Sequence, residues 1–407
     1  TEISKDINIK DADPSGFYEV IIPYSDDFVI YFNDSMGIIL SDIDNKGIDL
    51  KSVRDQMVGL KSDESILSKE DYKSLDKQSN DLMAYFSMDE LINAVAINNR
   101  NEKDLKIMRN ISKALPFGYT LNFEEDAIAL KVIGSENQES SLGSFYNEDG
   151  FSNDDLKNID PKGTPLAYLT MGLNFKKMMN FVIEQSKYQG NSEIDNQINQ
   201  AASSLQLTRD ELLNLVGGKA SLALSEIHVG DNSYENPTKP VLNFWMTLGD
   251  KNAAKKILDL ATNNGQLILD QGIYTENNPY RGPQYFIALI EDNLYFSTQK
   301  DPILQKLQKK EWAEIDEEHG GKDVTSNSMS MYMSLDYSSY KDIMRSQMNE
   351  YQFNALNKFQ SILSSFKSLN IHGKNNEVEM ILQFKEKNTN SLQRIIELLQ
   401  EAYQIAS

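Results

Sequence analysis

Met331-Tyr332-Met333-Ser334-Leu335-Asp336 is the segment from which the architecture can be predicted, because its pattern occurs at four places in the chain. The shared order is apolar, aromatic, apolar, hydroxyl, apolar, and then a polar residue or glycine. The copies lie roughly 75–90 residues apart, so each has room for a whole strand-and-helix unit. The other three copies are Ala84-Tyr85-Phe86-Ser87-Met88-Asp89, Ala167-Tyr168-Leu169-Thr170-Met171-Gly172 and Phe244-Trp245-Met246-Thr247-Leu248-Gly249.

Side chains in these copies alternate with the two-residue period of a β-strand. The face that we expect in the core carries Met329, Met331, Met333 and Leu335. After each copy the apolar residues adopt a helical period, as in 253–261, so we expect each strand to be covered by the helix that follows it. A carboxylate at the break can cap the free N–H groups of that helix, and Asp89, Asp250 and Asp336 are placed for this role.

Pairs of strands with tight turns lie between the copies. The predicted hairpins are 119–123 with 127–133, 285–290 with 294–297, and 369–372 with 378–384. Thr208 and Glu211 form a capping box that starts a further helix, and Gly217-Gly218 is expected to end it. The sequence therefore predicts an α+β fold of repeated strand-helix-hairpin units, with mostly antiparallel sheets covered by helices and ferredoxin-like split βαβ elements.

At 407 residues the chain is too long for one ordinary core, so we expect several packed units. Polar, glycine-containing segments near 139–163 and 314–327 suggest the boundaries. The predicted division is a flexible tether at 1–16, an N-terminal α+β unit at 17–150, a middle α+β unit at 151–320, and a C-terminal α+β unit at 321–407 packed on the middle one.

The formal net charge is −21, from 61 acidic and 40 basic side chains. A surface of this sign repels phosphate backbones and anionic lipids, so nucleic acid is not an expected partner. Cysteine is absent, which excludes disulfides and thiolate chemistry within these residues. No apolar run approaches the length that crosses a bilayer, so membrane attachment is expected only through a lipid anchor upstream of Thr1.

Several segments resemble a family of exported Bacteroidetes lipoproteins that carry a domain of unknown function. The matching segments are Lys46–Leu50, Asp81–Leu91, Leu121–Glu124, Pro165–Met178 and Leu212–Leu224, which are packing patterns. The resemblance covers most of the chain after Gly16. It implies a related fold and export with a lipid on an N-terminal cysteine upstream of Thr1, and it supplies no catalytic residue.

No pattern of catalytic or metal-binding residues is evident, and we expect no cofactor. The histidines His228, His319 and His372 are far apart and lack a second ligand at helical spacing. Asp42–Gly47 has only part of a calcium loop, and the acidic segment 147–155 is similar, so both are interpreted as ordinary turns. Phosphate-binding loops and the G-x-S-x-G nucleophile motif are also missing from the sequence.

The recurring aromatic residue is the strongest indication of a binding site in the sequence. Its four occurrences are Tyr85, Tyr168, Trp245 and Tyr332. If all four project from an open face of the sheet, they offer a platform on which sugar rings stack or a partner strand docks. The alternative is that each ring packs against a neighbouring strand or a covering loop.

These patterns favour a non-enzymatic, lipid-anchored protein of the cell envelope that binds or scaffolds a macromolecular partner. We expect it in the periplasm or at the outer-membrane surface. The alternative is a glycan-binding or glycan-processing accessory protein of the envelope, based on the aromatic residues and the abundant carboxylates. A divalent-metal hydrolase would need acidic and histidine side chains to converge in one cleft.

Overall fold

The computed structural model describes residues 8–21, 28–33, 37–41, 49–58, 70–77, 80–85, 116–134, 142–146, 150–188, 193–230, 238–278 and 284–406. The chain divides into two compact units, Thr1–Gln78 and Ser79–Ser407. The predicted calcium-like loop at 42–47 and the cap at Asp89 lie outside the described residues.

The smaller unit contains a four-stranded antiparallel sheet in the order β1-β2-β3-β4. Its elements are β1 (Asn8–Lys10), β2 (Tyr18–Ile21), β3 (Phe28–Phe32), β4 (Gly37–Ser41), α1 (Leu50–Val58) and α2 (Glu70–Asp76). β1 lies within the segment 1–16 that we predicted to be a flexible tether, and the prediction is wrong for these residues because Asn8–Lys10 pairs with β2.

Arg54 is the buried centre of this smaller unit. Its guanidinium lies 4.6 Å from the centre of the Tyr31 ring and 5.1 Å from that of Phe17. The charge is balanced by Asp13 at 2.7 Å and by Asp55 at 2.5 Å. Burial raises the pKa of Asp13, but the hydrogen bonds from Arg54 and from the backbone N–H groups of Phe17 and Ser15, together with the charge of Arg54, outweigh burial and lower the pKa to about 2.

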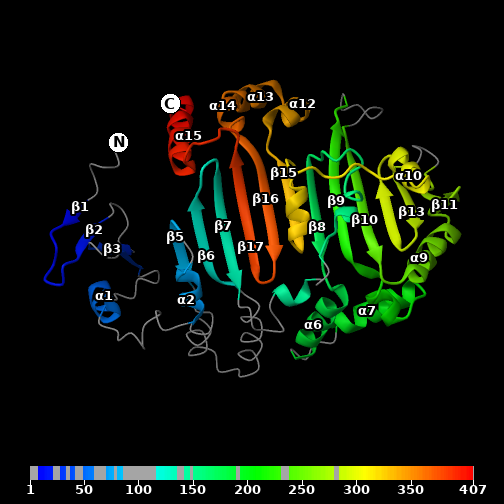
Figure 1. Cartoon of the computed structure of the whole chain (residues 1–407), viewed down its shortest axis with the longest axis horizontal. Coiled ribbons are helices and arrows are strands. Elements are labelled where there is room, and N and C mark those ends of the chain that lie inside the picture. The colour runs from blue at the N-terminus through cyan, green and yellow to red at the C-terminus, as the bar shows by residue number, and fades with distance from the viewer. Residues whose placement is uncertain are drawn as a thin grey trace. The chain divides into compact units, whose positions relative to one another are not determined.

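The larger unit is organised around a thirteen-stranded sheet in which every recorded pairing is antiparallel (Figure 1). Three of the recurring segments lie in strands, as predicted, namely in β8 (Ala167–Gly172), β10 (Lys239–Leu248) and β15 (Met329–Ser334). Of the first recurring segment, 84–89, the structure describes only residues 84 and 85, which are the end of β5 (Leu82–Tyr85). Helices follow the last three, namely α6 (Phe175–Tyr188), α9 (Lys251–Asn263) and α12 (Tyr337–Gln347). Asp250 and Asp336 cap α9 and α12 through their carboxylates, which confirms both predicted caps.

Three repeated units build most of the sheet, and in the two that begin with β8 and β15 the structure describes helices between the strand and the hairpin. Each begins with a recurring strand, and the hairpins that follow are β6 (Pro116–Phe123) with β7 (Ala127–Gly134), β9 (Val216–His228) with β10, and β16 (Phe366–Lys374) with β17 (Glu377–Phe384). The strand order is β10-β9-β8-β15-β16-β17-β7-β6-β5. The first strands of two units, β8 and β15, are therefore neighbours, and so are the last strands of two units, β17 and β7. The sheet therefore runs without a break across residues 150 and 320, where we predicted domain boundaries.

The remaining strands extend the sheet beyond β10. They are β11 (Leu267–Asp270), β12 (Ile273–Glu276), β13 (Phe286–Ile290) and β14 (Asn293–Ser297), and β14 pairs with β10. Four successive antiparallel pairings make β10 and β11 parallel to each other, so β10–α9–β11 is a split βαβ element. The predicted α+β class with antiparallel sheets is therefore confirmed.

Other local predictions are confirmed with small corrections. Thr208 and Glu211 form the capping box of α8 (Arg209–Leu213), and the three predicted hairpins are present. The Gly217-Gly218 pair lies inside β9 and does not end the helix. A Cβ at Gly217 would lie 2.8 Å from the carbonyl carbon of Leu248, so glycine is needed for this close approach. The remaining helices are α7 (Glu193–Ser204), α13 (Glu350–Asn357), α14 (Gln360–Leu363) and α15 (Ser391–Ala406).

The two faces of the large sheet are buried differently from what the alternation predicted. In β15 the most buried side chains are Ser330 and Tyr332, at 1% and 5% exposure, whereas Met329, Met331 and Met333 are half-buried. The expectation that the methionine side is the core is therefore wrong. The aromatic and hydroxyl side is the core, and we call it the aromatic face.

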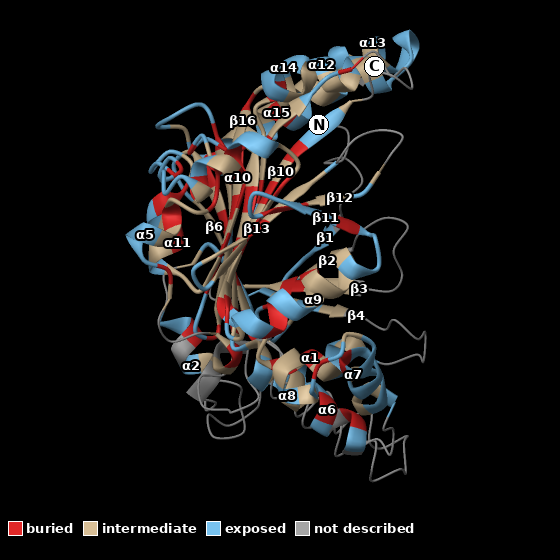
Figure 2. Cartoon of the chain, turned by 90° about the vertical axis from the view of Figure 1, so that its right-hand side faces the viewer, coloured by how far each residue is buried: buried red, intermediate tan, exposed pale blue. Residues whose placement is uncertain are grey.

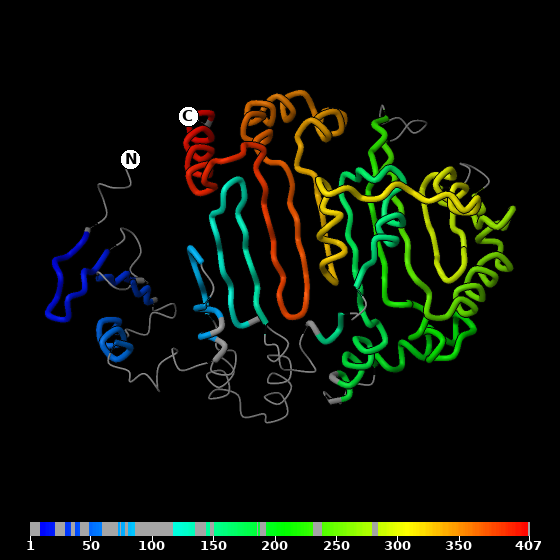
Figure 3. Tube along the Cα trace, viewed as in Figure 1, coloured from blue at the N-terminus to red at the C-terminus, as the bar shows by residue number. Residues whose placement is uncertain are grey.

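Long connections between strands, rather than the following helices, cover the aromatic face. The β7–β8 connection contributes α5 (Asn153–Leu156), and the β14–β15 connection contributes α10 (Lys300–Leu307) and α11 (Gly321–Ser326). The β7–β8 connection also contains η3 (Leu142–Phe145), where Phe145 packs against Phe181 of α6. Figure 2 shows α5, α10 and α11 on one side of the sheet and α9 on the other. In Figure 3 the yellow segment after α10 crosses β10, β9 and β8 before it enters β15.

One hydrophobic cluster joins the aromatic face to these connections. From the connections it includes Phe151, Leu156, Ile159, Ile303, Trp312, Ile315 and Val324, and from the sheet it includes Tyr168, Ala223, Trp245, Ala288, Tyr295 and Tyr332. The segments 139–163 and 314–327, whose polar composition suggested linkers, therefore also contain buried residues of this cluster.

Replacing Tyr332 with alanine should destabilise the larger unit by about 3–5 kcal/mol, because the ring is buried and stacked on Tyr168. Urea unfolding followed by the fluorescence of Trp245 and Trp312, which both lie in this unit, measures the loss. Tyr351→Ala is the matched control, since Tyr351 is 84% exposed, and it should change stability by less than about 0.5 kcal/mol. Equal effects of the two substitutions would contradict the assignment of the core.

Candidate functional site

The four recurring aromatic residues, predicted to form a platform, lie on one face of the large sheet. Strand pairings place Tyr85, Tyr168, Trp245 and Tyr332 on the same face of the sheet. Tyr168, Trp245 and Tyr332 are only 3%, 1% and 5% exposed. The prediction of an open stacking platform is therefore wrong for these three, because the crossover connections cover them.

Each buried ring has a partner within the protein. Tyr168 and Tyr332 stack with their centroids 5.8 Å apart at the junction of β8 and β15, and the Tyr168 hydroxyl donates a hydrogen bond of 3.2 Å to the carbonyl oxygen of Gly320. The Trp245 indole N–H donates to Asn293 Oδ1 at 3.0 Å. Half-buried Tyr85 lies 6.1 Å from Phe117. Burial raises the pKa of Tyr332 to about 12, so its hydroxyl stays protonated at neutral pH.

Each of the three histidines contacts a different acidic residue. His228 contacts Glu226 at 3.3 Å, His319 contacts Asp316 at 2.7 Å, and His372 lies 3.6 Å from Asp323. Among the residues that the structure describes, no group of three or more histidine, aspartate, glutamate or cysteine side chains is arranged to hold a metal ion.

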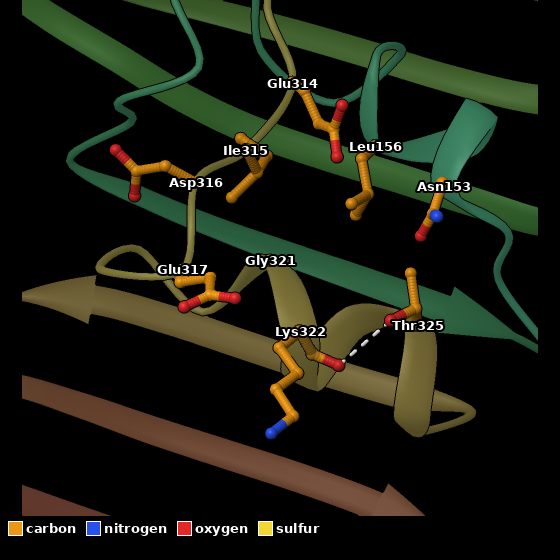
Figure 4. Close-up of a pocket in the computed structure, with 9 residues that line it drawn as sticks. All are labelled: Asn153, Leu156, Glu314, Ile315, Asp316, Glu317, Gly321, Lys322 and Thr325. Carbon is orange, nitrogen blue, oxygen red and sulfur yellow. Dashed lines mark hydrogen bonds between the residues drawn. The ribbon is translucent and has the colours of Figure 1, made fainter.

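A pocket of about 540 Å³ lies where α5, α11 and the segment before α11 meet (Figure 4). Its lining residues are Asn153, Leu156, Glu314, Ile315, Asp316, Glu317, Gly321, Lys322 and Thr325. Leu156 and Ile315, which are also part of the hydrophobic cluster, supply its apolar wall.

The polar side chains of the pocket limit what it can accept. Figure 4 shows the Glu314 carboxylate beside Leu156, with the Asp316 carboxylate and the Lys322 ammonium directed away. Asp316 instead accepts a hydrogen bond from the backbone N–H of His319 at 2.8 Å. The inward carboxylate would repel an anion, so the pocket suits a neutral or cationic group. The sequence patterns did not indicate this site, because its residues come from separate segments.

The opposite face of the sheet forms a second candidate site, which we call the aliphatic face. Residues opposite one another in neighbouring strands make an unbroken apolar row across the sheet. In strand order the row is Leu82, Leu121, Leu130, Met380, Ile371, Met331, Leu169 and Leu222. Seven steps between strands about 4.8 Å apart give the row a length of about 34 Å.

The aliphatic face is accessible to solvent. Leu222 is 45% exposed and Met380 is 39% exposed, and the residues of the row between them are half-buried. A parallel row beside it, from Ile128 through Leu382, Leu369 and Met333, is also apolar and half-buried. Apolar side chains that continue over such a length on an accessible surface are typical of an interaction site.

The described helices of the larger unit leave the central part of this face uncovered. α6 and α7 lie beyond one end of the central strands and α12–α14 beyond the other (Figure 1). α9 covers the aliphatic face near β11–β13, where Leu258 packs with Leu267 and Tyr274. The alternation of Met329, Met331 and Met333 predicted this apolar face, but it could not show that the other face would be the covered one.

The chain belongs to a protein family defined by a domain of unknown function (DUF4836), whose model matches residues 16–392. The predicted kinship with an uncharacterised domain family is thereby confirmed. Searches of curated proteins and of solved structures gave no significant match. Within the described residues, no helix has the length and apolar character needed to span a membrane.

Substitutions on the aliphatic face should cost little stability. Leu222→Gln and Met380→Gln should each lower the free energy of unfolding by less than about 1 kcal/mol, because water already reaches both side chains. Ile303→Ala, in the fully buried cluster, should cost about 2–5 kcal/mol. Urea titrations of the three variants provide the comparison, and a large loss at Leu222 would show that it is a core residue.

Proposed function

We propose that this protein binds and scaffolds a protein partner in the cell envelope, with the aliphatic face as its docking surface. The observation that carries the proposal is the apolar row of about 34 Å between Leu82 and the exposed Leu222, which includes the exposed Met380. A row of this length matches the dimension of a standard protein interface rather than that of a small ligand.

The chemistry of the row supports a partner that presents an apolar surface. Methionine and leucine side chains can adapt to different apolar surfaces, and methionine is flexible and polarisable. The row contains no charged residue, so it offers burial of apolar area rather than an ionic contact. The partner should therefore present its own apolar surface. The buried Tyr168, Trp245 and Tyr332 give no support to the alternative of a sugar-stacking platform.

Site-specific photo-crosslinking in the native host is the direct test. A photoreactive amino acid at Leu222 or Met380 should give one defined crosslinked protein of constant mass, because both positions face the same partner. The control position is Lys310, which is exposed and follows α10 on the covered side of the sheet. Crosslinks of the same yield and pattern at all three positions, or none at Leu222 and Met380, would contradict the proposal.

Lipid anchoring at the envelope is a separate part of the proposal. It is supported by the acidic, cysteine-free composition and by the resemblance to exported lipoproteins. Metabolic labelling of the full gene product in its native host with a clickable palmitate analogue should yield a labelled protein in the membrane fraction. An unlabelled protein in the soluble fraction would overturn this part and leave the docking surface to be judged by its own experiment.

A further inference from the structure

The C-terminal helix α15 presents a stripe of exposed apolar side chains. The stripe consists of Leu392, Ile396, Leu399 and Tyr403, which are 44%, 48%, 65% and 76% exposed. Their spacing of four, three and four residues places them in one line along a helix. This is the spacing of the seam of a coiled coil, in which each side chain inserts between those of a second helix.

The opposite side of α15 is anchored to its own protein, so the helix cannot turn the stripe inward. Leu398 and Ser391 are buried at 6% and 0% exposure. Arg394 donates a hydrogen bond of 2.9 Å to Ser365 Oγ and forms ion pairs with Glu386 at 3.4 Å and Glu397 at 3.3 Å. The stripe is thus a second apolar side of a helix whose first side is already packed.

Charge is absent from the stripe and from its borders. In the heptad that places Leu392 and Leu399 at d and Ile396 and Tyr403 at a, the flanking e and g positions are Gln393, Ile395, Gln400 and Ala402. These flanks usually carry the charges that select or reject a partner helix. In a chain with a net charge of −21, two copies would repel each other at most surfaces, whereas this strip contains no carboxylate.

The stripe is also complementary to itself in the antiparallel direction. A twofold axis between residues 397 and 398 would place Tyr403 against Leu392 of a second copy, and Ile396 against its Leu399. Each large side chain then meets one of a different shape, and the same patch serves both molecules, as an isologous interface requires. The uncharged flanks offer no ionic contact that would select a different partner helix.

We propose that two copies of this chain associate through α15, with the two helices antiparallel and the four stripe residues of each copy forming the seam. This interface is distinct from the aliphatic face, so the dimer would leave both docking surfaces free. A seam of two heptads is short, but each helix is already formed and anchored, so association does not require helix nucleation. We expect a dissociation constant on the order of micromolar.

Sedimentation velocity of the whole chain between about 1 and 100 μM measures this association. The protein should shift from monomer to dimer over that range. Leu399→Glu should weaken the dimer by about 30-fold, because it places a carboxylate in the centre of the seam. Tyr351→Glu, on the exposed side of α13, is the control and should leave the dissociation constant unchanged. A monomer at 100 μM, or equal weakening by both substitutions, would overturn the proposal.

Introduced cysteines test the orientation, since the chain has none of its own. When Ile396→Cys protein is mixed with Leu399→Cys protein under mild oxidation, the mixed disulfide dimer should predominate, because the antiparallel register opposes these two positions. Rapid disulfide formation within each variant alone, without the mixed species, would indicate parallel helices and overturn the antiparallel register. Unchanged circular dichroism and thermal melting confirm that the variants are folded, as expected for side chains so exposed.

Discussion

Burial of the aromatic face beneath two crossover connections constrains the rest of the larger unit. The connections carry few apolar residues, yet Ile159, Ile303 and Val324 are completely buried in the cluster that they share with the sheet. Stacking of Tyr168 on Tyr332 joins β8 to β15, which is where the first strands of two repeated units meet. A covered aromatic face leaves the aliphatic face as the accessible surface of the same strands.

Much of the architecture could be predicted from local patterns. The strand period in the four recurring segments, the turn residues of the hairpins, and the caps at Thr208, Asp250 and Asp336 all depend on neighbours in sequence, and the structure contains each of the described ones. These signals are local because capping and alternation involve hydrogen bonds and side-chain directions within a few residues.

The choice of face could not be predicted in the same way. Alternation shows that Met331 and Tyr332 point to opposite sides, but which side is covered depends on segments far away, around Leu156 and Trp312. Serine and tyrosine in the core are stabilised by partners that the sequence does not reveal, such as the carbonyl oxygen of Gly320 for Tyr168. The pocket between α5 and α11 could not be predicted either, because its lining residues come from separate segments of the chain. The DUF4836 family is defined by a domain of unknown function, so membership of it assigns no activity to these surfaces.

Acrylamide quenching of tryptophan fluorescence tests the central claim most directly. The chain has two tryptophans, Trp245 at 1% exposure and Trp312 at 3%, and one comes from the sheet while the other comes from a crossover connection. If the aromatic face is sealed, the folded protein should show blue-shifted emission and a quenching constant several-fold below that of the urea-unfolded chain. Emission near that of free tryptophan, with equal quenching in both states, would show that the aromatic face is open and would contradict the account.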